Sequence, residues 1–242
     1  MRERGDSSRP DPSPAPFSKV GAVIVAAGDS QRMGGRDKVF AEVAGRPLLA
    51  WVVDVFQGCA SVHQVVIVVS ERNLEAGRRL VGEQGWSKVT EVCSGGRRRQ
   101  DSVAQGLRRL VDCHWVVIHD GARPCLSVDL IERGLAEVAE TGAAVAAVPV
   151  KDTIKIVGPT GAVQETPSRD KLWAAQTPQL FRFDIIDRAY QQARDEVTDD
   201  AALVEDLGYR VKVYMGSYRN IKVTTPEDLA LAETLLSKRE RG

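Results

Sequence analysis

Short apolar runs rich in valine, isoleucine and alanine alternate along the chain with longer segments in which apolar residues recur at the spacing of an amphipathic helix. The runs are GAVIVA at 21–26, QVVIVV at 64–69, KVTEVC at 88–93, WVVIH at 115–119 and GAAVAAVPV at 142–150. The helical segments lie around Leu48–Phe56, Leu74–Val81, Asp101–Leu110 and Leu130–Glu140. Strands that are apolar on both faces are typical of a parallel sheet covered by helices on each side. The pattern therefore predicts an α/β fold with a doubly wound, mostly parallel sheet.

The alternation stops at Lys151, where KDTIKIVGPTGAVQETPSRDKLW contains two short β-like runs around GPTG and few residues for a core. An irregular excursion of this length inside a compact domain is usually functional. Two short strands are only marginally stable alone, so we predict a protruding β-arm at about 151–173 that a partner covers. Regular signals resume at about Phe183 and close with a helix that has Thr225 as its N-cap.

Length and composition favour one domain. The chain has 242 residues, of which 43% are apolar, enough to bury a sizeable core. We predict a single domain over residues 19–242. The first 18 residues, MRERGDSSRPDPSPAPFS, are rich in proline, serine and charge, and we predict that they form a disordered tail.

Charge and apolar content exclude several classes of protein. Lys plus Arg equals Asp plus Glu, so the formal net charge is zero and no global field attracts nucleic acid or an anionic membrane. No apolar run has the length of a membrane span, and the N-terminus lacks a signal-peptide core, so we expect a cytoplasmic protein. The cysteines and histidines have no zinc-site spacing.

The stretch VAAGDSQRMGGRDK, at 25–38, follows the first apolar run and so lies at the carboxyl end of a predicted strand, where open parallel sheets bind ligands. Glycines let backbone amides approach an anion, and Arg32 and Lys38 can neutralise phosphate charge. We therefore predict a phosphate-binding loop. The stretch has neither the P-loop nor the dinucleotide-binding spacing, and the alternative is a flexible turn with a solvated edge.

Two further strand ends carry similar chemistry. CSGGRRRQDSV places two glycines and three arginines before a helix start, and VVIHDGARP ends a buried strand in Asp120. Asp120 is a candidate ligand for a Mg²⁺ ion that holds nucleotide phosphates. The alternatives are a basic turn with an N-cap at the first site and an Asx-turn at the second. We expect His119 to be packed or hydrogen-bonded rather than to act as an acid or base.

Seven motifs together resemble the 2-C-methyl-D-erythritol 4-phosphate cytidylyltransferase family: VAAGDSQRMGGRDK, GGRRRQDSV, VIHDGARP, PVKDTIK, PSRDKLWAAQTPQLF, TDDAALVED and NIKVTTPEDLALAE. They occur in the family's order and spacing from about Val20 to the end. The resemblance implies a Rossmann-like nucleotidyltransferase domain that uses Mg²⁺, takes CTP and 2-C-methyl-D-erythritol 4-phosphate as substrates, and forms a homodimer through the arm.

The resemblance also implies roles for individual residues. Four cationic side chains match the family's catalytic positions: Arg32, Lys38, Arg169 and Lys222. Residues at three strand ends match those that bind CTP: Ala26, Ala27, Gly28, Gly95, Gly96, Ser102, Asp120 and Gly121. Asp120 is also the implied metal contact. Five residues match those that hold the sugar phosphate, and in the family the two on the arm serve the neighbouring subunit: Arg123, Thr153, Arg169, Thr177 and Lys222.

The chain departs from the family at Asp37, where a proline is common, and at Arg219, near which an acidic residue is common. Two other functions stay open from the sequence. One is cytidylyl transfer to ribitol 5-phosphate, which needs the same nucleotide half and a different polyol pocket. The other is an inactive nucleotide-binding dimer, which the two departures motivate.

Overall fold

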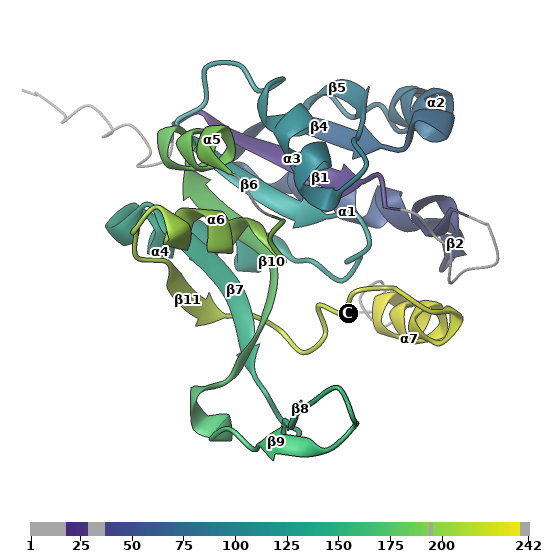
Figure 1. Ribbon diagram of the computed structural model, residues 1–242. Helices are drawn as coiled ribbons and strands as arrows, with labels where there is room; N and C mark the ends of the chain where they lie inside the picture. The colour runs from purple at the N-terminus through teal and green to yellow at the C-terminus, as the bar shows by residue number, and fades with distance from the viewer. Residues whose placement is uncertain (1–17, 29–36, 194–195, 238–242) are drawn as a thin grey trace, which may run out of the picture.

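A seven-stranded sheet forms the centre of the protein (Figure 1), whose computed structural model describes residues 18–28, 37–193 and 196–237. The strand order is β11-β7-β10-β6-β1-β4-β5. The strands are β1 (Val20–Ala26), β4 (Val62–Val69), β5 (Val89–Ser94), β6 (Trp115–Asp120), β7 (Ala143–Pro149), β10 (Trp173–Arg182) and β11 (Lys212–Met215). Strand β10 is antiparallel to both β6 and β7, and the other neighbours pair in parallel. The predicted mostly parallel sheet is confirmed.

Helices cover both faces of this sheet. They are α1 (Leu48–Gly58), α2 (Leu74–Gln84), α3 (Arg99–Leu107), α4 (Val128–Thr141), α5 (Phe183–Gln192), α6 (Asp200–Asp206) and α7 (Pro226–Ser237). Alternate side chains of β1 face opposite layers: Ile24 packs in a core with α1 and α4, whereas Val23 packs in a core with α3, α5 and α6. The doubly wound arrangement is therefore confirmed, and the four helices predicted from periodicity are α1 to α4.

Two short 3₁₀ turns and a small hairpin complete the body of the domain. They are the 3₁₀ turns η2 (Lys38–Phe40) and η3 (Glu71–Asn73) and the small hairpin β2 (Glu42–Val43) and β3 (Arg46–Pro47). Helix α7 packs on this hairpin and on α1 through a small apolar core. The amide of Asp228 donates to Thr225 Oγ1 at 3.4 Å, which agrees with the predicted N-cap.

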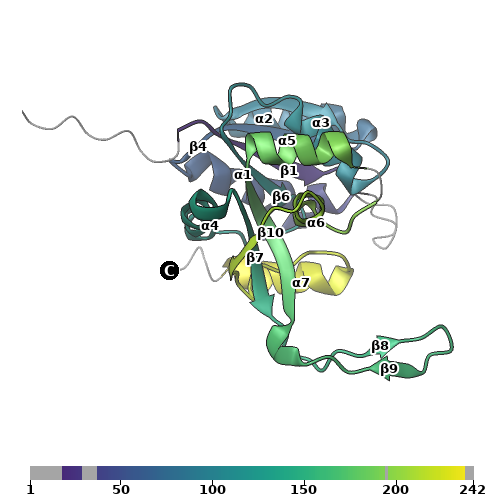
Figure 2. The same ribbon diagram turned by 60° about the vertical axis from the view of Figure 1, so that its left-hand side comes forward.

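The predicted arm is a thin projection that stands away from the sheet (Figure 2). It contains the hairpin β8 (Ile156–Val157) and β9 (Val163–Glu165) and the 3₁₀ turn η4 (Arg169–Lys171). The apolar side chains of the hairpin are 44% to 57% exposed. A hairpin that leaves this much apolar surface in water lacks a core of its own within this chain.

The order of the strands fixes where a ligand site can form. The chain runs outward from β1 to β4 and β5 and then returns to the other side of β1 as β6. This reversal opens a crevice at the carboxyl ends of β1, β5 and β6, as in other doubly wound sheets.

Within the described part of the chain, no helix has the length and apolar character needed to cross a membrane. The predicted tail at 1–18 lies outside the described residues apart from Ser18.

Candidate active site

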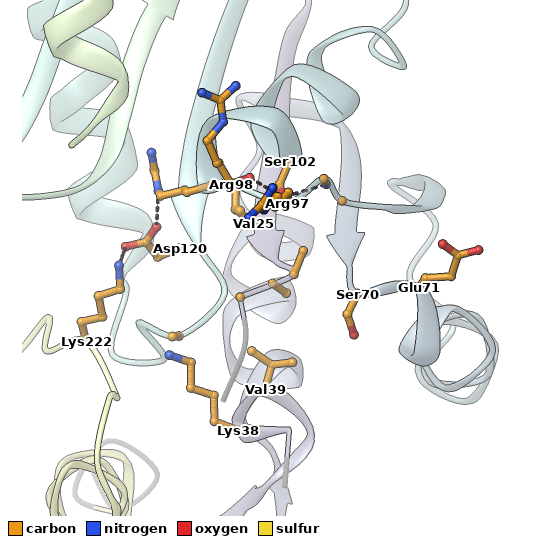
Figure 3. A pocket seen from close by; sticks show the side chains of 17 residues that line it. Val25, Lys38, Val39, Ser70, Glu71, Arg97, Arg98, Ser102, Asp120 and Lys222 are labelled. Carbon is orange, nitrogen blue, oxygen red and sulfur yellow. Dashed lines mark hydrogen bonds and ion pairs between the residues drawn. The ribbon is translucent and has the colours of Figure 1, made fainter. Parts of the chain in front are cut away.

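A cavity of about 410 Å³ opens at this crevice (Figure 3). Nine of the residues expected at the site line it: Ala26, Ala27, Gly28, Lys38, Gly95, Gly96, Ser102, Asp120 and Lys222. Ser70 and Glu71, at the start of η3, line the opposite side and were not expected. The structure therefore brings these residues from separate strand ends together around one cavity.

Tight packing shapes the β5–α3 turn. A Cβ atom on Gly95 would lie 2.4 Å from Ala27 Cβ and 2.5 Å from Ser102 Oγ, so only glycine fits there. Ser102 is buried, and its Oγ accepts a hydrogen bond from the Gly96 amide and donates one to the carbonyl of Arg98, both at 3.1 Å. Its single hydrogen is thus engaged inside the protein, so this hydroxyl can only accept a hydrogen bond that a ligand donates.

Lys38 begins η2 and lines the cavity. Asp37, the departure that precedes it, is directed to η3: its carboxylate accepts a hydrogen bond from Asn73 Nδ2 and lies 3.6 Å from a guanidinium nitrogen of Arg72. The side chain of Asp37 is 10% exposed. Asp37 therefore ties the segment that carries Lys38 to the end of β4. Arg32, the other cation expected in this loop, lies outside the described residues.

Three cations surround the carboxylate of Asp120, which is 6% exposed. Arg99 Nε lies 3.1 Å from its Oδ1, and its Oδ2 lies 2.9 Å from Lys222 Nζ and 3.4 Å from Arg123 Nε. Burial alone would raise the pKa of Asp120, but attraction to the three cations outweighs it and holds the pKa well below its usual range. Asp120 is therefore ionised throughout the neutral range.

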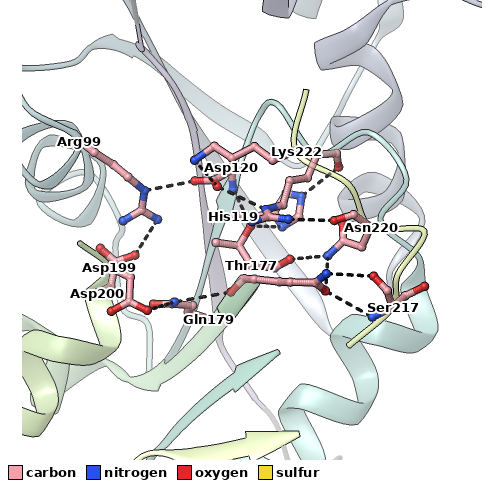
Figure 4. Close-up of polar contacts among 12 residues, drawn as sticks. Arg99, His119, Asp120, Thr177, Gln179, Asp199, Asp200, Ser217, Asn220 and Lys222 are labelled. Carbon is pink, nitrogen blue, oxygen red and sulfur yellow. Dashed lines mark hydrogen bonds and ion pairs between the residues drawn. The ribbon is translucent and has the colours of Figure 1, made fainter. Parts of the chain in front are cut away.

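Arg99 also reaches Asp200 on α6, which is 1% exposed (Figure 4). The distance from its NH2 nitrogen to Asp200 Oδ2 is 2.8 Å, and Tyr190 donates its hydroxyl to the other oxygen of Asp200 at 2.5 Å. Burial and the neighbouring Asp200 carboxylate raise the pKa of Tyr190. One guanidinium thus joins the wall of this cavity to α6.

A second cavity of about 240 Å³ adjoins the first and shares Arg99, Asp120 and Lys222 with it. Arg123 and Thr177, both expected to hold the sugar phosphate, line this second cavity. The two groups of predicted residues therefore meet at a common wall.

Other expected residues lie elsewhere. Thr153 and Arg169 are exposed on the arm, where Arg169 donates to the carbonyl of Lys151 at 2.7 Å, and neither lines either cavity of its own chain. Gly121 packs behind the cavity wall, with its amide 2.8 Å from the Val25 carbonyl, and Ala122 lines the cavity in its place. Arg219 donates to the Leu235 carbonyl in the last turn of α7 at 3.2 Å, so it stabilises that helix end.

The sequence places Arg99 only among the three arginines of a basic turn, and it assigns no role to Asp200. Both lie within stretches that carry the family resemblance, GGRRRQDSV and TDDAALVED, and that was the available signal. The two residues are 101 positions apart in the sequence, so no local spacing predicts their contact.

Comparison with known proteins agrees with the motifs. Residues 20–238 match the family model for 2-C-methyl-D-erythritol 4-phosphate cytidylyltransferase, IspD. A protein of that name from Dehalococcoides mccartyi (strain ATCC BAA-2266 / KCTC 15142 / 195) is 54% identical over 220 residues, which are 91% of this chain and 97% of the relative. One from Alkaliphilus oremlandii is 45% identical over 93% of this chain and 98% of the relative.

Solved structures give the same result. The crystal structure of 4-diphosphocytidyl-2C-methyl-D-erythritol synthase from Anaerococcus prevotii superposes with a TM-score of 0.82 at 30% identity, covering 91% of this chain and 97% of that one. The 2-C-methyl-D-erythritol 4-phosphate cytidylyltransferase of Thermus thermophilus gives 0.73 at 33% identity over 91% and 100%. The chain therefore belongs to the 2-C-methyl-D-erythritol 4-phosphate cytidylyltransferase family.

Proposed function

We propose that the protein transfers the cytidylyl group of CTP to 2-C-methyl-D-erythritol 4-phosphate and releases pyrophosphate. The observation that carries the proposal is the pair of adjoining cavities with Asp120 and Lys222 in their common wall. A nucleotide in the first cavity and a sugar phosphate in the second bring the α-phosphate and the attacking phosphate together at this wall. Holding two reactants in contact supplies much of the rate enhancement of a two-substrate reaction.

Ser102 supports cytosine as the base. Its hydroxyl is restricted to accepting, because its hydrogen is engaged by Arg98. The exocyclic amino group of cytosine is a donor, whereas the carbonyl that uracil carries at the same position is an acceptor and would leave both groups unpaired. A site built to pair a ligand's polar group discriminates strongly against an analogue that lacks it.

The chemistry is an in-line attack of a phosphate oxygen of the sugar phosphate on the α-phosphorus of CTP, with pyrophosphate leaving. A phosphate monoester is already a nucleophile, so no strong general base is needed. The cations of the site offset the charge that develops on the α-phosphate and on the leaving group. Lys38 and Lys222 supply this charge from the described cavity, and Arg32 is assigned the same role from its motif.

Magnesium fits this site as an ion held mainly by the nucleotide. Mg²⁺ in such enzymes is usually bound by one or two carboxylates together with substrate phosphates and water. Asp120 is the carboxylate shared by both cavities, and within the described ranges no three acidic, histidine or cysteine side chains cluster into a complete metal site. Asp120 would thus hold the ion from the protein side, and the bound metal would neutralise phosphate charge.

The arm supports a homodimer with shared active sites. It carries exposed apolar residues at its hairpin, and Thr153 and Arg169 are exposed polar groups suited to a phosphorylated polyol. Neither side chain lines the cavities of its own chain. If the arm crosses a two-fold axis, each chain covers the other's arm and completes the other's sugar-phosphate site.

Steady-state pyrophosphate release tests the function. The assay compares CTP with UTP and 2-C-methyl-D-erythritol 4-phosphate with ribitol 5-phosphate. We expect turnover with CTP and the methylerythritol phosphate. For UTP we expect a kcat/KM at least about tenfold lower, which is the order expected for one unpaired polar group. Preference for ribitol 5-phosphate would assign the other polyol, and binding of CTP without turnover of either acceptor would indicate an inactive nucleotide-binding protein.

A further inference from the structure

His119 is the penultimate residue of β6 and is completely buried between the sheet and Phe56, whose ring centroid lies 5.7 Å away. It nevertheless makes two polar contacts (Figure 4). Its Nδ1 lies 3.0 Å from Thr177 Oγ1, and its Nε2 lies 3.2 Å from the carbonyl oxygen of Arg123. Both contacts lead to residues that line the second cavity.

The partners determine which ring nitrogen carries the proton. A carbonyl oxygen can only accept, so Nε2 must carry hydrogen and donate to Arg123. The ring is completely buried, and its two polar partners are a carbonyl oxygen and a hydroxyl, neither of which carries a charge. A buried imidazolium would be costly in these surroundings, so the ring is neutral and its Nδ1 is an acceptor. The hydroxyl of Thr177 must therefore donate to Nδ1.

The same hydroxyl already has a second partner. The amide of Asp120 donates to Thr177 Oγ1 at 3.0 Å. This bond continues the β6–β10 pairing beyond Ile118 and Gln179, where the backbone register ends. A hydroxyl has one hydrogen and two lone pairs, so Thr177 retains one lone pair and no hydrogen.

We infer that His119 is a positioning residue that restricts Thr177 to accepting a hydrogen bond from a hydroxyl of the sugar alcohol. A dianionic phosphate offers only acceptors, so Thr177 cannot bind it, and the phosphate contacts fall to the cationic side chains of the site. The inference rests on the proposed function and refines the expectation that Thr177 holds the sugar phosphate. It assigns one end of the second cavity to the polyol.

The first experiment measures the tautomer in the unmodified protein. Nitrogen NMR of ¹⁵N-histidine-labelled enzyme at neutral pH should show His119 with Nε2 protonated and Nδ1 bare. A protonated Nδ1 would overturn the inference whatever the enzyme's activity, which separates this result from failure of the proposed function.

The second experiment follows the hydroxyl through the kinetics. Thr177→Val should raise KM for the methylerythritol phosphate about tenfold, the size of one lost hydrogen bond, and leave KM for CTP within about twofold. Thr177→Ser, which keeps the hydroxyl, should restore most of the affinity. A set of substrate analogues that each lack one hydroxyl identifies the donor. The analogue that lacks the hydroxyl bound by Thr177 should have the same affinity for the wild type and for Thr177→Val. Equal loss with every analogue would overturn the inference.

The third experiment asks whether His119 acts through Thr177. His119→Phe removes the acceptor and should raise KM for the sugar phosphate, whereas His119→Asn can present a carbonyl oxygen to Thr177 and should retain more affinity. In the Thr177→Val background, His119→Phe should change KM by less than about twofold, since the hydroxyl that it orients is absent. Additive effects on KM would show an independent role for His119 and refute the inference. If His119→Phe does not fold, the same comparison uses His119→Asn and His119→Gln.

Discussion

Replacing Arg99 with methionine removes the guanidinium that joins Asp120 to Asp200. Asp120 keeps Lys222 and Arg123, but Asp200, 1% exposed, loses the ion pair that compensates its charge. Removing one partner of a buried pair typically costs about 3–5 kcal/mol, and the 27% exposure of the Arg99 side chain screens part of this, so we expect about 2–3 kcal/mol. For a chain of this length that loss lowers Tm by about 5–10 °C.

Chemical denaturation with a two-state fit measures the effect. Arg99→Lys is the matched control, because a lysine keeps the charge but lacks the fork that reaches both carboxylates, and it should lose less. Adding Asp200→Asn to Arg99→Met should recover stability, since the uncompensated charge is then gone. The reasoning fails if Arg99→Met is as stable as the wild type. It also fails if the stability losses of Arg99→Met and Asp200→Asn simply add in the double variant, because the buried charge of Asp200 then does not depend on Arg99.

Three further outcomes are expected. Lys38→Ala should lower kcat by about 10²–10³ in the pyrophosphate assay and leave Tm unchanged, because its charge acts mainly in the transition state; near-normal kcat would remove Lys38 from the chemistry. Mixing Arg169→Ala with Lys38→Ala chains should restore activity, since a mixed dimer contains one site with both residues; inactive mixed dimers after verified subunit exchange would show that the arm serves its own chain. Burial lowers the pKa of His119 from 6.5 to about 4, so the unfolded chain binds the extra proton between these values. Stability is therefore full above about pH 6.5 and falls with pH towards 4, by about 3 kcal/mol from this group, and the difference between wild type and His119→Phe should change over that window; a constant difference would contradict the buried neutral ring.

The sequence predicted the strands with continuous apolar runs and failed where a strand has a polar composition. Strand β10 contains Gln176, Thr177, Pro178 and Gln179, which are typical of a loop, yet these residues are buried because their polar groups are paired. Gln179, for example, donates to Asp199 and accepts from the amide of Ala201. Such pairing depends on tertiary contacts, and no local periodicity encodes it.

The candidate site also has features that the sequence predicts and features that it does not. Lys38, Gly95 and Asp120 were predictable because parallel strands bring their carboxyl ends to one edge, so chemistry at each strand end must converge. The direction of the hydrogen bonds at Ser102 and Thr177 was not, because it depends on which partner faces each hydroxyl. Residue type names the group, but the surroundings decide whether it donates or accepts.

The arm leaves and rejoins the sheet at one point, since Pro149 pairs with Trp173 and the amide of Val150 donates to the Leu172 carbonyl at 3.0 Å. The intervening segment, 151–171, is thus an insertion between two strands that pair with each other on either side of it. A change in the length of this segment therefore need not change the register of β7 and β10. An engineer can therefore exchange it for a tight turn and test the proposed dimer while the cavity at the strand ends stays intact.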